Sequence, residues 1–143
     1  ISWYHICMKE NLIHYRTCVC NINYHMVWSV KYRRKILSAE VEAYLQKLVQ
    51  EIAEDKGFTV HLFECEEGDH VHCFVSAPPK LSITAIMKYL KGISGRKLFE
   101  RFPEIRNQLW KGELWNHSYY VETVGSVSEE NIRRYIEHQS KAY

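Results

Sequence analysis

Two histidines separated by a single residue are the first pattern in this sequence that could do chemistry. His70 and His72 lie in a run of otherwise apolar residues that is typical of a β-strand. Residues two apart on a strand point to the same side of the sheet, so the two imidazoles would lie side by side. Two neutral imidazoles at that separation can bind one divalent metal ion. Considered alone, the pattern occurs more often as two exposed histidines that bind nothing.

A second candidate group lies near the end of the chain, where Tyr135 and Gln139 are four residues apart. On a helix this spacing places both side chains on one face. The amide oxygen of Gln139 could be a third metal ligand, and a phenol beside a metal-bound phosphate can act as a nucleophile. The commoner role of a lone tyrosine at such a position is packing in the core. His138 lies on another face of the same helix and is the weaker ligand candidate.

The charged residues are distributed in blocks. The formal net charge is +2, which by itself argues against a nucleic-acid partner. Residues 1–37 hold six basic and one acidic side chain, and residues 80–111 hold eight basic and two acidic side chains. Residues 38–79 hold two basic and nine acidic side chains, and residues 112–143 hold three basic and five acidic side chains. The near-neutral total is a cancellation, and we expect a polarised surface whose acidic block faces away from nucleic acid.

The two basic blocks could bind phosphate groups through one loop and one helix. The candidate contacts are Lys31, Arg33, Arg34, Lys88, Lys91, Arg96 and Lys97. Gly92 and Gly95 lower the stability of this helix, which indicates close packing or close approach of its backbone. A solvated helix face is the alternative, but Glu100 is the only acidic residue between Lys80 and Arg101.

Aromatic side chains could add a second kind of contact, because unpaired bases stack on aromatic rings. The candidates are Trp110, Trp115, Tyr119 and Tyr120. We expect some of these rings to pack in the core instead.

Hydrophobic periodicity predicts the elements that must position these residues. Alternating apolar residues predict strands over 17–30, 58–65, 70–77 and 118–125. Three- and four-residue spacing predicts helices that begin after Ser38, Ser82 and Ser128. The first helix should end at Gly57 and the second before Pro103, and residues 103–117 are expected to be irregular.

The resulting order, β-α-β-β-α-β followed by one helix, predicts an α+β fold of the ferredoxin-like type. Two helices would cover one face of an antiparallel sheet. Val71, Cys73 and Val75 would point toward those helices, which leaves His70 and His72 on the opposite face. We interpret residues 1–143 as one domain without repeats or linkers, and residues 1–7 as sequence that precedes a natural start at Met8.

Composition narrows the class of protein. With 46% hydrophobic and 25% charged residues, the chain lies in the range of globular proteins and outside that of disordered tails, coiled coils and collagens. No apolar run approaches the ~20 residues of a membrane span, and no segment is typical of a signal peptide. The five cysteines form no C-x-x-C pair, so we expect free thiols packed as small hydrophobic side chains rather than a zinc site.

Five segments, taken in order, resemble the single-tyrosine HUH transposases, the short transposases of the insertion sequence 200/605 type. The first runs from Tyr24 to Trp28 and continues into the basic residues 31–34. The others are Asp69-His70-Val71-His72, Leu90-Lys91-Gly92-x-Ser94, Leu114-Trp115-Asn116-x-Ser118-Tyr119 and Tyr135-Ile136-x-x-Gln139. The resemblance extends from about Tyr15 to Gln139, and the ordered set is far more specific than the histidine pair.

This resemblance implies a transposase of single-stranded DNA. By it, His70, His72 and Gln139 would hold a divalent ion, magnesium or manganese, and Tyr135 would be the nucleophile. Attack on the scissile phosphate would leave a 5′-phosphotyrosine and a free 3′-OH. The resemblance also implies a homodimer in which Tyr135 serves the partner's metal site, a bacterial or archaeal cytoplasmic location, and DNA hairpins at the element ends as partners. The hairpin contacts would be the seven basic residues named above.

Two other functions remain open at this stage. A domesticated enzyme could act on repeated palindromes in a host genome, and hairpins flanking the gene would distinguish it. A hairpin-binding module without catalysis could retain the same fold, although the presence of His70, His72, Tyr135 and Gln139 argues against it.

Overall fold

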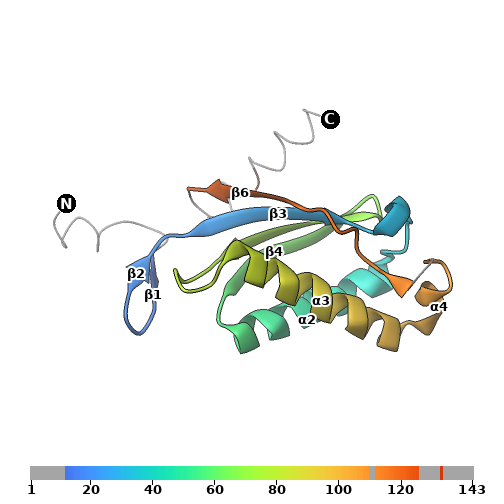
Figure 1. The fold of residues 1–143 in the computed structure, drawn as a ribbon, viewed down its shortest axis with the longest axis horizontal. Coiled ribbons are helices and arrows are strands. Elements are labelled where there is room, and N and C mark those ends of the chain that lie inside the picture. Colours follow the sequence, from blue (N-terminus) through green and yellow to red (C-terminus); the bar gives the residue numbers. More distant parts are fainter. Residues whose placement is uncertain (1–11, 110–111, 126–132, 134–143) are drawn as a thin grey trace.

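The computed structural model describes residues 12–109, 112–125 and 133 of the chain. Four antiparallel strands form one sheet in the order β4-β5-β3-β6. These strands are β3 (Asn23–Ser29), β4 (Thr59–Glu66), β5 (His70–Ser76) and β6 (Tyr120–Val124). The two long helices, α2 (Ala39–Lys56) and α3 (Ile83–Arg101), lie on the same side of this sheet (Figure 1). The predicted α+β fold, its antiparallel sheet and its two main helices are therefore confirmed, whereas the helix expected after Ser128 lies outside the described residues.

Hydroxyl caps set the starts of both long helices where the sequence predicts them. The Ser38 hydroxyl accepts the backbone N–H of Val41 at 3.3 Å, and the Ser82 hydroxyl accepts that of Ala85 at 3.0 Å. Gly57 ends α2 with a φ of 83°, a left-handed conformation that glycine adopts without a steric cost. These caps fix both helices relative to the strands that follow them.

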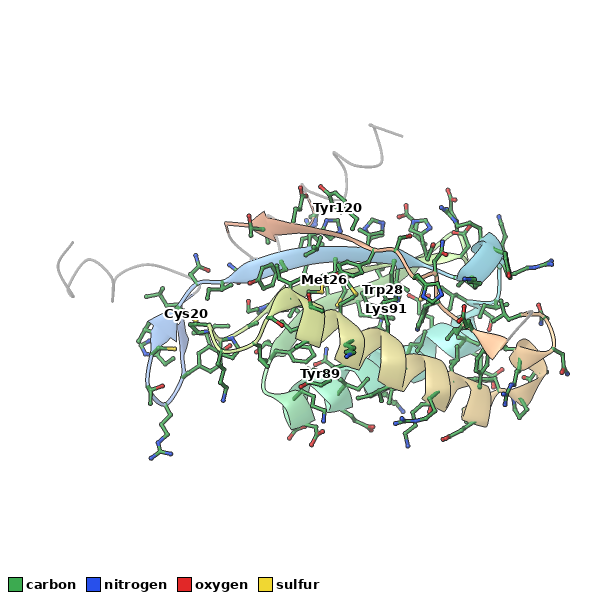
Figure 2. All side chains as sticks on the ribbon, viewed as in Figure 1. Cys20, Met26, Trp28, Tyr89, Lys91 and Tyr120 are labelled. Atoms are coloured by element: carbon green, nitrogen blue, oxygen red, sulfur yellow. The ribbon has the colours of Figure 1, made fainter. Side chains whose placement is uncertain are left out.

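The core lies between the sheet and the two helices. Met26 and Trp28 of β3 point into it, as Figure 2 shows, together with Val71 and Cys73 of β5. Leu45 of α2 is among the helix residues that complete this layer. Because side chains alternate along a strand, the residues between these positions lie on the sheet face that the helices leave uncovered. His70 and His72 are on that face.

The long strand predicted over 17–30 is interrupted. Val19 and Cys20 form β2, which pairs with β1 (Ile13–His14) in a separate two-stranded ribbon. The main sheet begins only at Asn23, which pairs with Ser76 on one side. The predicted continuity is wrong at residues 21–22, because the chain changes partner there. Alternation of side chains cannot reveal a change of partner.

The segment between α3 and β6 is more ordered than predicted. It contains a short helix, α4 (Pro103–Arg106), and then a loop that packs against α3. A Cβ at Gly95 would lie 3.6 Å from the Trp115 ring, so the expected close packing is confirmed there. A Cβ at Gly92 would have no neighbour within 4 Å, so this glycine is not closely packed against the described residues.

Two strained residues follow β3. The 3₁₀ turn η1 (Lys31–Arg33) contains Tyr32 and Arg33 with φ angles of 60° and 53°. The Arg33 backbone N–H donates to the Val30 carbonyl at 2.9 Å. Left-handed backbone is uncommon for side chains of this size, so the turn is held against its intrinsic preference.

The described cysteines are free thiols. Cys73 is fully buried in the core, as expected of a small hydrophobic side chain, whereas Cys18, Cys20 and Cys65 are only partly buried. Burial raises the pKa of Cys65 to about 12, with a further increase from the charges of Glu42 and Glu64. Among the described helices, none is both long and apolar enough to cross a lipid bilayer.

Candidate functional site

The two histidines lie side by side at the start of β5. Their ring centroids are 5.3 Å apart, and the side chains of His70 and His72 are only 16% and 14% exposed. The β4–β5 turn brings them there, because Glu67 and Gly68 adopt φ angles of 56° and 72°, which suit a tight hairpin. The spacing in the sequence therefore predicts the placement of both imidazoles correctly.

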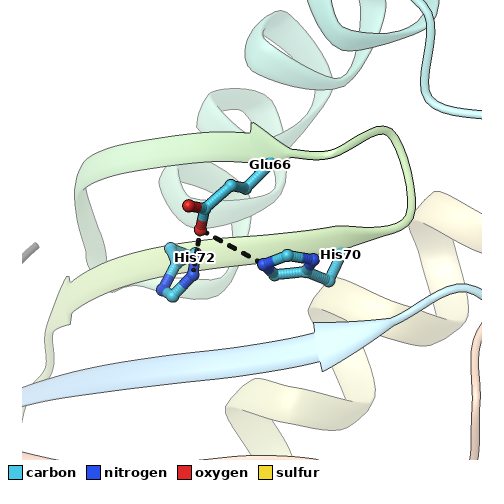
Figure 3. A group of neighbouring side chains, drawn as sticks. All are labelled: Glu66, His70 and His72. Carbon is cyan, nitrogen blue, oxygen red and sulfur yellow. Dashed lines mark hydrogen bonds and ion pairs between the residues drawn. The ribbon is translucent and has the colours of Figure 1, made fainter. Parts of the chain in front are cut away.

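A carboxylate from the neighbouring strand completes a three-residue cluster (Figure 3). Glu66 ends β4 opposite His70. Its Oε2 lies 2.8 Å from the Nε2 of His72 and 3.2 Å from the Nε2 of His70. Glu66 is a site residue that was not predicted from the sequence. A signal was present, since a tight turn between residues 66 and 70 places these two residues on the same face.

Glu66 and Asp69 also correct the expectation about the acidic block. Both belong to residues 38–79, which were expected to face away from the nucleic-acid site. They instead contact the paired histidines. The polarised distribution of charge therefore does not separate these two carboxylates from the site.

The cluster has the donor set of a divalent metal site. One ligand atom from each of Glu66, His70 and His72 lies within 4.8 Å of the others. Two donors bound to one ion at about 2.1 Å each would be about 3 Å apart at right angles, close to the two distances found here. Two imidazoles suit manganese and later metals, whereas magnesium prefers ligands that are all oxygen.

A carboxylate fixes the orientation of His70. The Nδ1 of His70 lies 2.7 Å from Asp69 Oδ1, and Arg33 donates to the same carboxylate at 3.2 and 3.4 Å. Burial alone would raise the pKa of Asp69, but the hydrogen bonds from His70 and Arg33 hold it below its usual value. A charged carboxylate at Nδ1 favours a proton on that nitrogen, which leaves the lone pair of Nε2 for a metal.

A third histidine lies behind His72. The Nε2 of His25, in β3, is 2.9 Å from the Nδ1 of His72, and His25 is fully buried. Burial, followed by the nearby charge of His72, lowers the pKa of His25 to about 4. Burial also lowers the pKa of His72. Both rings are thus neutral near pH 7, the state in which an imidazole can bind a metal ion.

The predicted DNA contacts divide into two groups. Arg34, Lys88, Arg96 and Lys97 are exposed. The other three are engaged in contacts within the protein. Arg33 binds Asp69, and Lys31 lies 3.1 Å from Glu113. The Lys91 ammonium donates to the backbone carbonyls of Asn116 and His117 at 2.5 and 3.2 Å, and burial lowers its pKa.

The aromatic candidates also differ in their surroundings. Trp115 is buried and its Nε1 donates to the Ser94 hydroxyl at 2.9 Å, so its ring belongs to the core. Tyr119 and Tyr120 are 40% and 50% exposed. Trp110 lies outside the described residues, as do Tyr135, Gln139 and His138. The roles predicted for Tyr135 and Gln139 therefore stay predictions.

Residues 18–139 match the sequence model of a family described as "Transposase IS200 like". The ISDra2 transposase TnpA of Deinococcus radiodurans is 40% identical over 124 residues, which span 87% of this chain and 88% of that protein. The transposase for insertion sequence element IS200 of Salmonella typhimurium is 34% identical over 131 residues, which span 92% of this chain and 83% of that protein.

Two solved structures share the fold. A crystal structure of a protein from Deinococcus radiodurans R1 superposes with a TM-score of 0.71 at 36% identity, covering 89% of this chain and 97% of that chain. The structure of a REP-associated tyrosine transposase bound to a REP hairpin superposes with a TM-score of 0.55 at 12% identity, covering 86% of this chain and 67% of that chain.

Proposed function

Since this chain belongs to the IS200-like transposase family, we propose that it cleaves and rejoins single-stranded DNA through a 5′-phosphotyrosine intermediate. Membership of the family makes it a transposase, an enzyme of DNA cleavage and transfer. Beyond family membership, we propose that the DNA is single-stranded, that the intermediate is covalent, and that particular residues carry out the reaction.

The observation that carries the proposal is the convergence of His70, His72 and Glu66 on the sheet face opposite α2 and α3. Glu66 Oε2 lies at hydrogen-bond distance from the Nε2 of both histidines, and both histidines are fixed from behind by further side chains. Such outer contacts are a regular feature of metal-binding histidines, because they set the tautomer and the ring orientation. A pair of merely exposed histidines would need neither.

We propose that His70, His72 and Gln139 hold a divalent ion and that Glu66 adds a carboxylate oxygen to this set. Such an ion would polarise the scissile phosphate and neutralise charge that develops during the reaction. Gln139 is included on the strength of the sequence pattern, whereas Glu66 is included on its contacts with both histidines.

Tyr135 would supply the nucleophile. Its phenolate oxygen would form a bond to the phosphorus, the bond from phosphorus to the 3′ oxygen would break, and that oxygen would leave as a 3′-OH after taking up a proton. The 5′-phosphotyrosine preserves the energy of the phosphodiester, so a 3′-OH can reverse the step and join DNA without ATP.

The proposed substrate is single-stranded DNA that carries a hairpin. The exposed cations Arg34, Lys88, Arg96 and Lys97 could bind its phosphates. A protein of this fold has been solved bound to a REP hairpin, which makes hairpin DNA the first substrate to test. A homodimer in which Tyr135 serves the partner's metal centre is part of the same proposal.

The test of the nucleophile uses hairpin DNA labelled at its 3′ end, because the fragment joined through its 5′-phosphate retains that label. Incubation with Mn²⁺ should yield a labelled protein band that survives denaturing electrophoresis. Tyr135→Phe should abolish the band. Tyr119→Phe should retain it, because it removes the hydroxyl of a different, exposed tyrosine that directly precedes β6. A labelled adduct of the Tyr135→Phe protein would disprove the assignment.

The test of the metal centre separates cleavage from binding. His70→Ala should abolish adduct formation and leave the affinity for the hairpin within about threefold, since the loss concerns chemistry rather than phosphate contacts. Equal loss of cleavage and binding would instead identify His70 as a structural residue. A protein that binds hairpins but forms no adduct with Mn²⁺ would be the non-catalytic binding module.

A further inference from the structure

His25 is a buried polar side chain, next to the histidine pair, that the proposed reaction does not use. It lies in the central strand β3, in register with Phe74 of β5 and Glu122 of β6. It is fully buried, on the sheet face that α2 and α3 leave uncovered. Burial of a polar ring in the middle of a sheet is unfavourable unless its nitrogens are used.

The geometry between His25 and His72 is that of a directed hydrogen bond. The two nitrogens are 2.9 Å apart, whereas the ring centroids are 5.2 Å apart and the ring planes differ by 7°. Because the nitrogens are so much closer than the centroids, the rings meet edge to edge in nearly parallel planes. A lone pair of one ring then points along the N–H of the other.

The neighbours of His25 hold its ring plane and favour one of its tautomers. Phe74 stacks on the ring with centroids 4.5 Å apart and planes 15° apart. Glu122 Oε1 lies 3.8 Å from the Nδ1 of His25, and a carboxylate there favours a proton on Nδ1. This tautomer leaves the Nε2 of His25 as an acceptor, directed at His72.

We propose that His25 is a positioning residue of the metal centre: its Nε2 accepts the Nδ1–H of His72 and thereby directs the Nε2 lone pair of His72 at the bound ion. The inference rests on the proposed function, because it requires metal binding by His72. It gives the two ligands matched support, with Asp69 behind His70 and His25 behind His72.

The first experiment measures Mn²⁺ binding by the electron paramagnetic resonance signal of the free ion, without DNA. His25→Phe retains an aromatic ring against Phe74 but removes the acceptor, and should weaken Mn²⁺ binding about tenfold or more. His25→Gln places an amide oxygen near the position of Nε2 and should restore the affinity to within about threefold of the unmodified protein.

The matched control is His61→Phe. His61 lies on β4, with its Nε2 2.6 Å from the Ser76 hydroxyl, and has no contact with the three-residue cluster. This variant should bind Mn²⁺ like the unmodified protein. Unchanged Mn²⁺ affinity in His25→Phe would overturn the inference and leave the proposed function intact. Absence of Mn²⁺ binding by the unmodified protein would refute the metal part of the proposed function, and the inference with it.

The second experiment needs no variant, so it does not depend on whether His25→Phe folds. Long-range ¹H–¹⁵N correlation spectra of the unmodified protein, loaded with diamagnetic Zn²⁺, report which nitrogen of each imidazole carries the proton. The inference requires His72 with a proton on Nδ1 and His25 with an unprotonated Nε2. A proton on the Nε2 of His25 in the loaded protein would overturn it, because that nitrogen could then not accept.

Discussion

At the scale of single residues, the candidate site consists of two imidazole rings, and the two nitrogens of each ring have different neighbours. The Nε2 atoms of His70 and His72 face each other and Glu66, whereas their Nδ1 atoms are occupied by Asp69 and His25. Each ring thus has one nitrogen directed at Glu66, which is the candidate metal-binding nitrogen, and one nitrogen held by a supporting side chain. Asp69 directly precedes His70 in the chain, whereas His25 reaches His72 through the pairing of β3 with β5.

Glu66 provides a prediction at this scale. It is the only carboxylate in the three-residue cluster, so Glu66→Gln removes the negative charge of the donor set while preserving its shape. We expect Mn²⁺ affinity to fall about tenfold or more. Titration of Mn²⁺ into the purified variant measures the change.

Glu64→Gln is the control for Glu66→Gln. Glu64 pairs with His72 across the β4–β5 ladder and carries the same charge, but lies outside the cluster. Its replacement should change the affinity far less. Equal effects of the two substitutions would show that Glu66 acts through its charge at a distance and not as a ligand.

His25 provides a second prediction, which concerns stability against pH. Burial keeps its pKa at about 4 in the folded protein, whereas an unfolded chain takes up this proton near pH 6.5. Protonation therefore favours the unfolded chain, and the free energy of unfolding should fall by about 3 kcal/mol as the pH drops from 6.5 to 4. Urea denaturation of metal-free protein across this range measures the slope.

The comparison with His25→Phe isolates this contribution, because the other histidines titrate in both proteins. The variant should lose less stability over the same interval. If the two proteins lose stability in parallel, His25 is not the group that takes up the proton.

The residues of the site differ in how far the sequence could predict them. The placement of His70 and His72 follows from strand periodicity alone, because a spacing of two fixes a common face. Glu66 depends on the register of the tight turn between residues 66 and 70, which was a local signal, whereas His25 depends on which distant strands pair and is not visible in a local pattern. Glu66 lies in an acidic stretch that is typical of a turn, and His25 lies in an alternating stretch that is typical of a strand. Neither residue therefore stood out as a site residue.

At the scale of elements, α3 illustrates how two glycines in one helix can have unrelated roles. Gly95 faces Trp115, whose indole donates to Ser94, whereas Gly92 faces open space. A helix interior disfavours glycine by about 1 kcal/mol relative to alanine. Of the two, only Gly95 is a position where an added Cβ would contact neighbouring side chains, those of Trp115 and Leu114.

The two glycines give a matched pair of substitutions. Gly92→Leu should stabilise the protein by about 0.5–1 kcal/mol, because it improves helix propensity at a position where an added Cβ has no neighbour within 4 Å. Gly95→Leu should destabilise it by about 1–3 kcal/mol, since the longer side chain must displace Trp115. Urea denaturation of both variants would test the pair, and stabilisation by Gly95→Leu would contradict the packing described here.

The bounds of α2 and α3 were predictable because each is marked by a local chemical signal, a serine cap at the start and a glycine or proline at the end. The interruption before β3 could not be predicted, because β2 and β3 share one alternating pattern of apolar residues but pair with different strands. The short helix α4 was also missed, because four residues are too few to establish a period.

At the scale of the whole molecule, the small net charge conceals exposed cations on α3 and after η1. Lys88→Ala should weaken binding of hairpin DNA and lower the slope of log affinity against log salt by about 1, because one phosphate contact is lost. Lys47→Ala removes an exposed lysine from α2, within the acidic block, and should leave the slope unchanged. Filter binding at several salt concentrations measures both slopes, and identical slopes for the two variants would exclude Lys88 as a contact.

The strained turn η1 has a consequence for how this protein could be engineered. A glycine at position 32 or 33 would adopt the observed backbone more easily, by about 1–2 kcal/mol at each position, than the tyrosine and arginine found there. Arg33 instead binds Asp69, which contacts the candidate metal ligand His70, and Tyr32 presents a half-exposed ring beside the basic residues. Selection for thermal stability alone would therefore favour glycine in this turn and erode the site, which makes η1 a point of conflict between stability and activity.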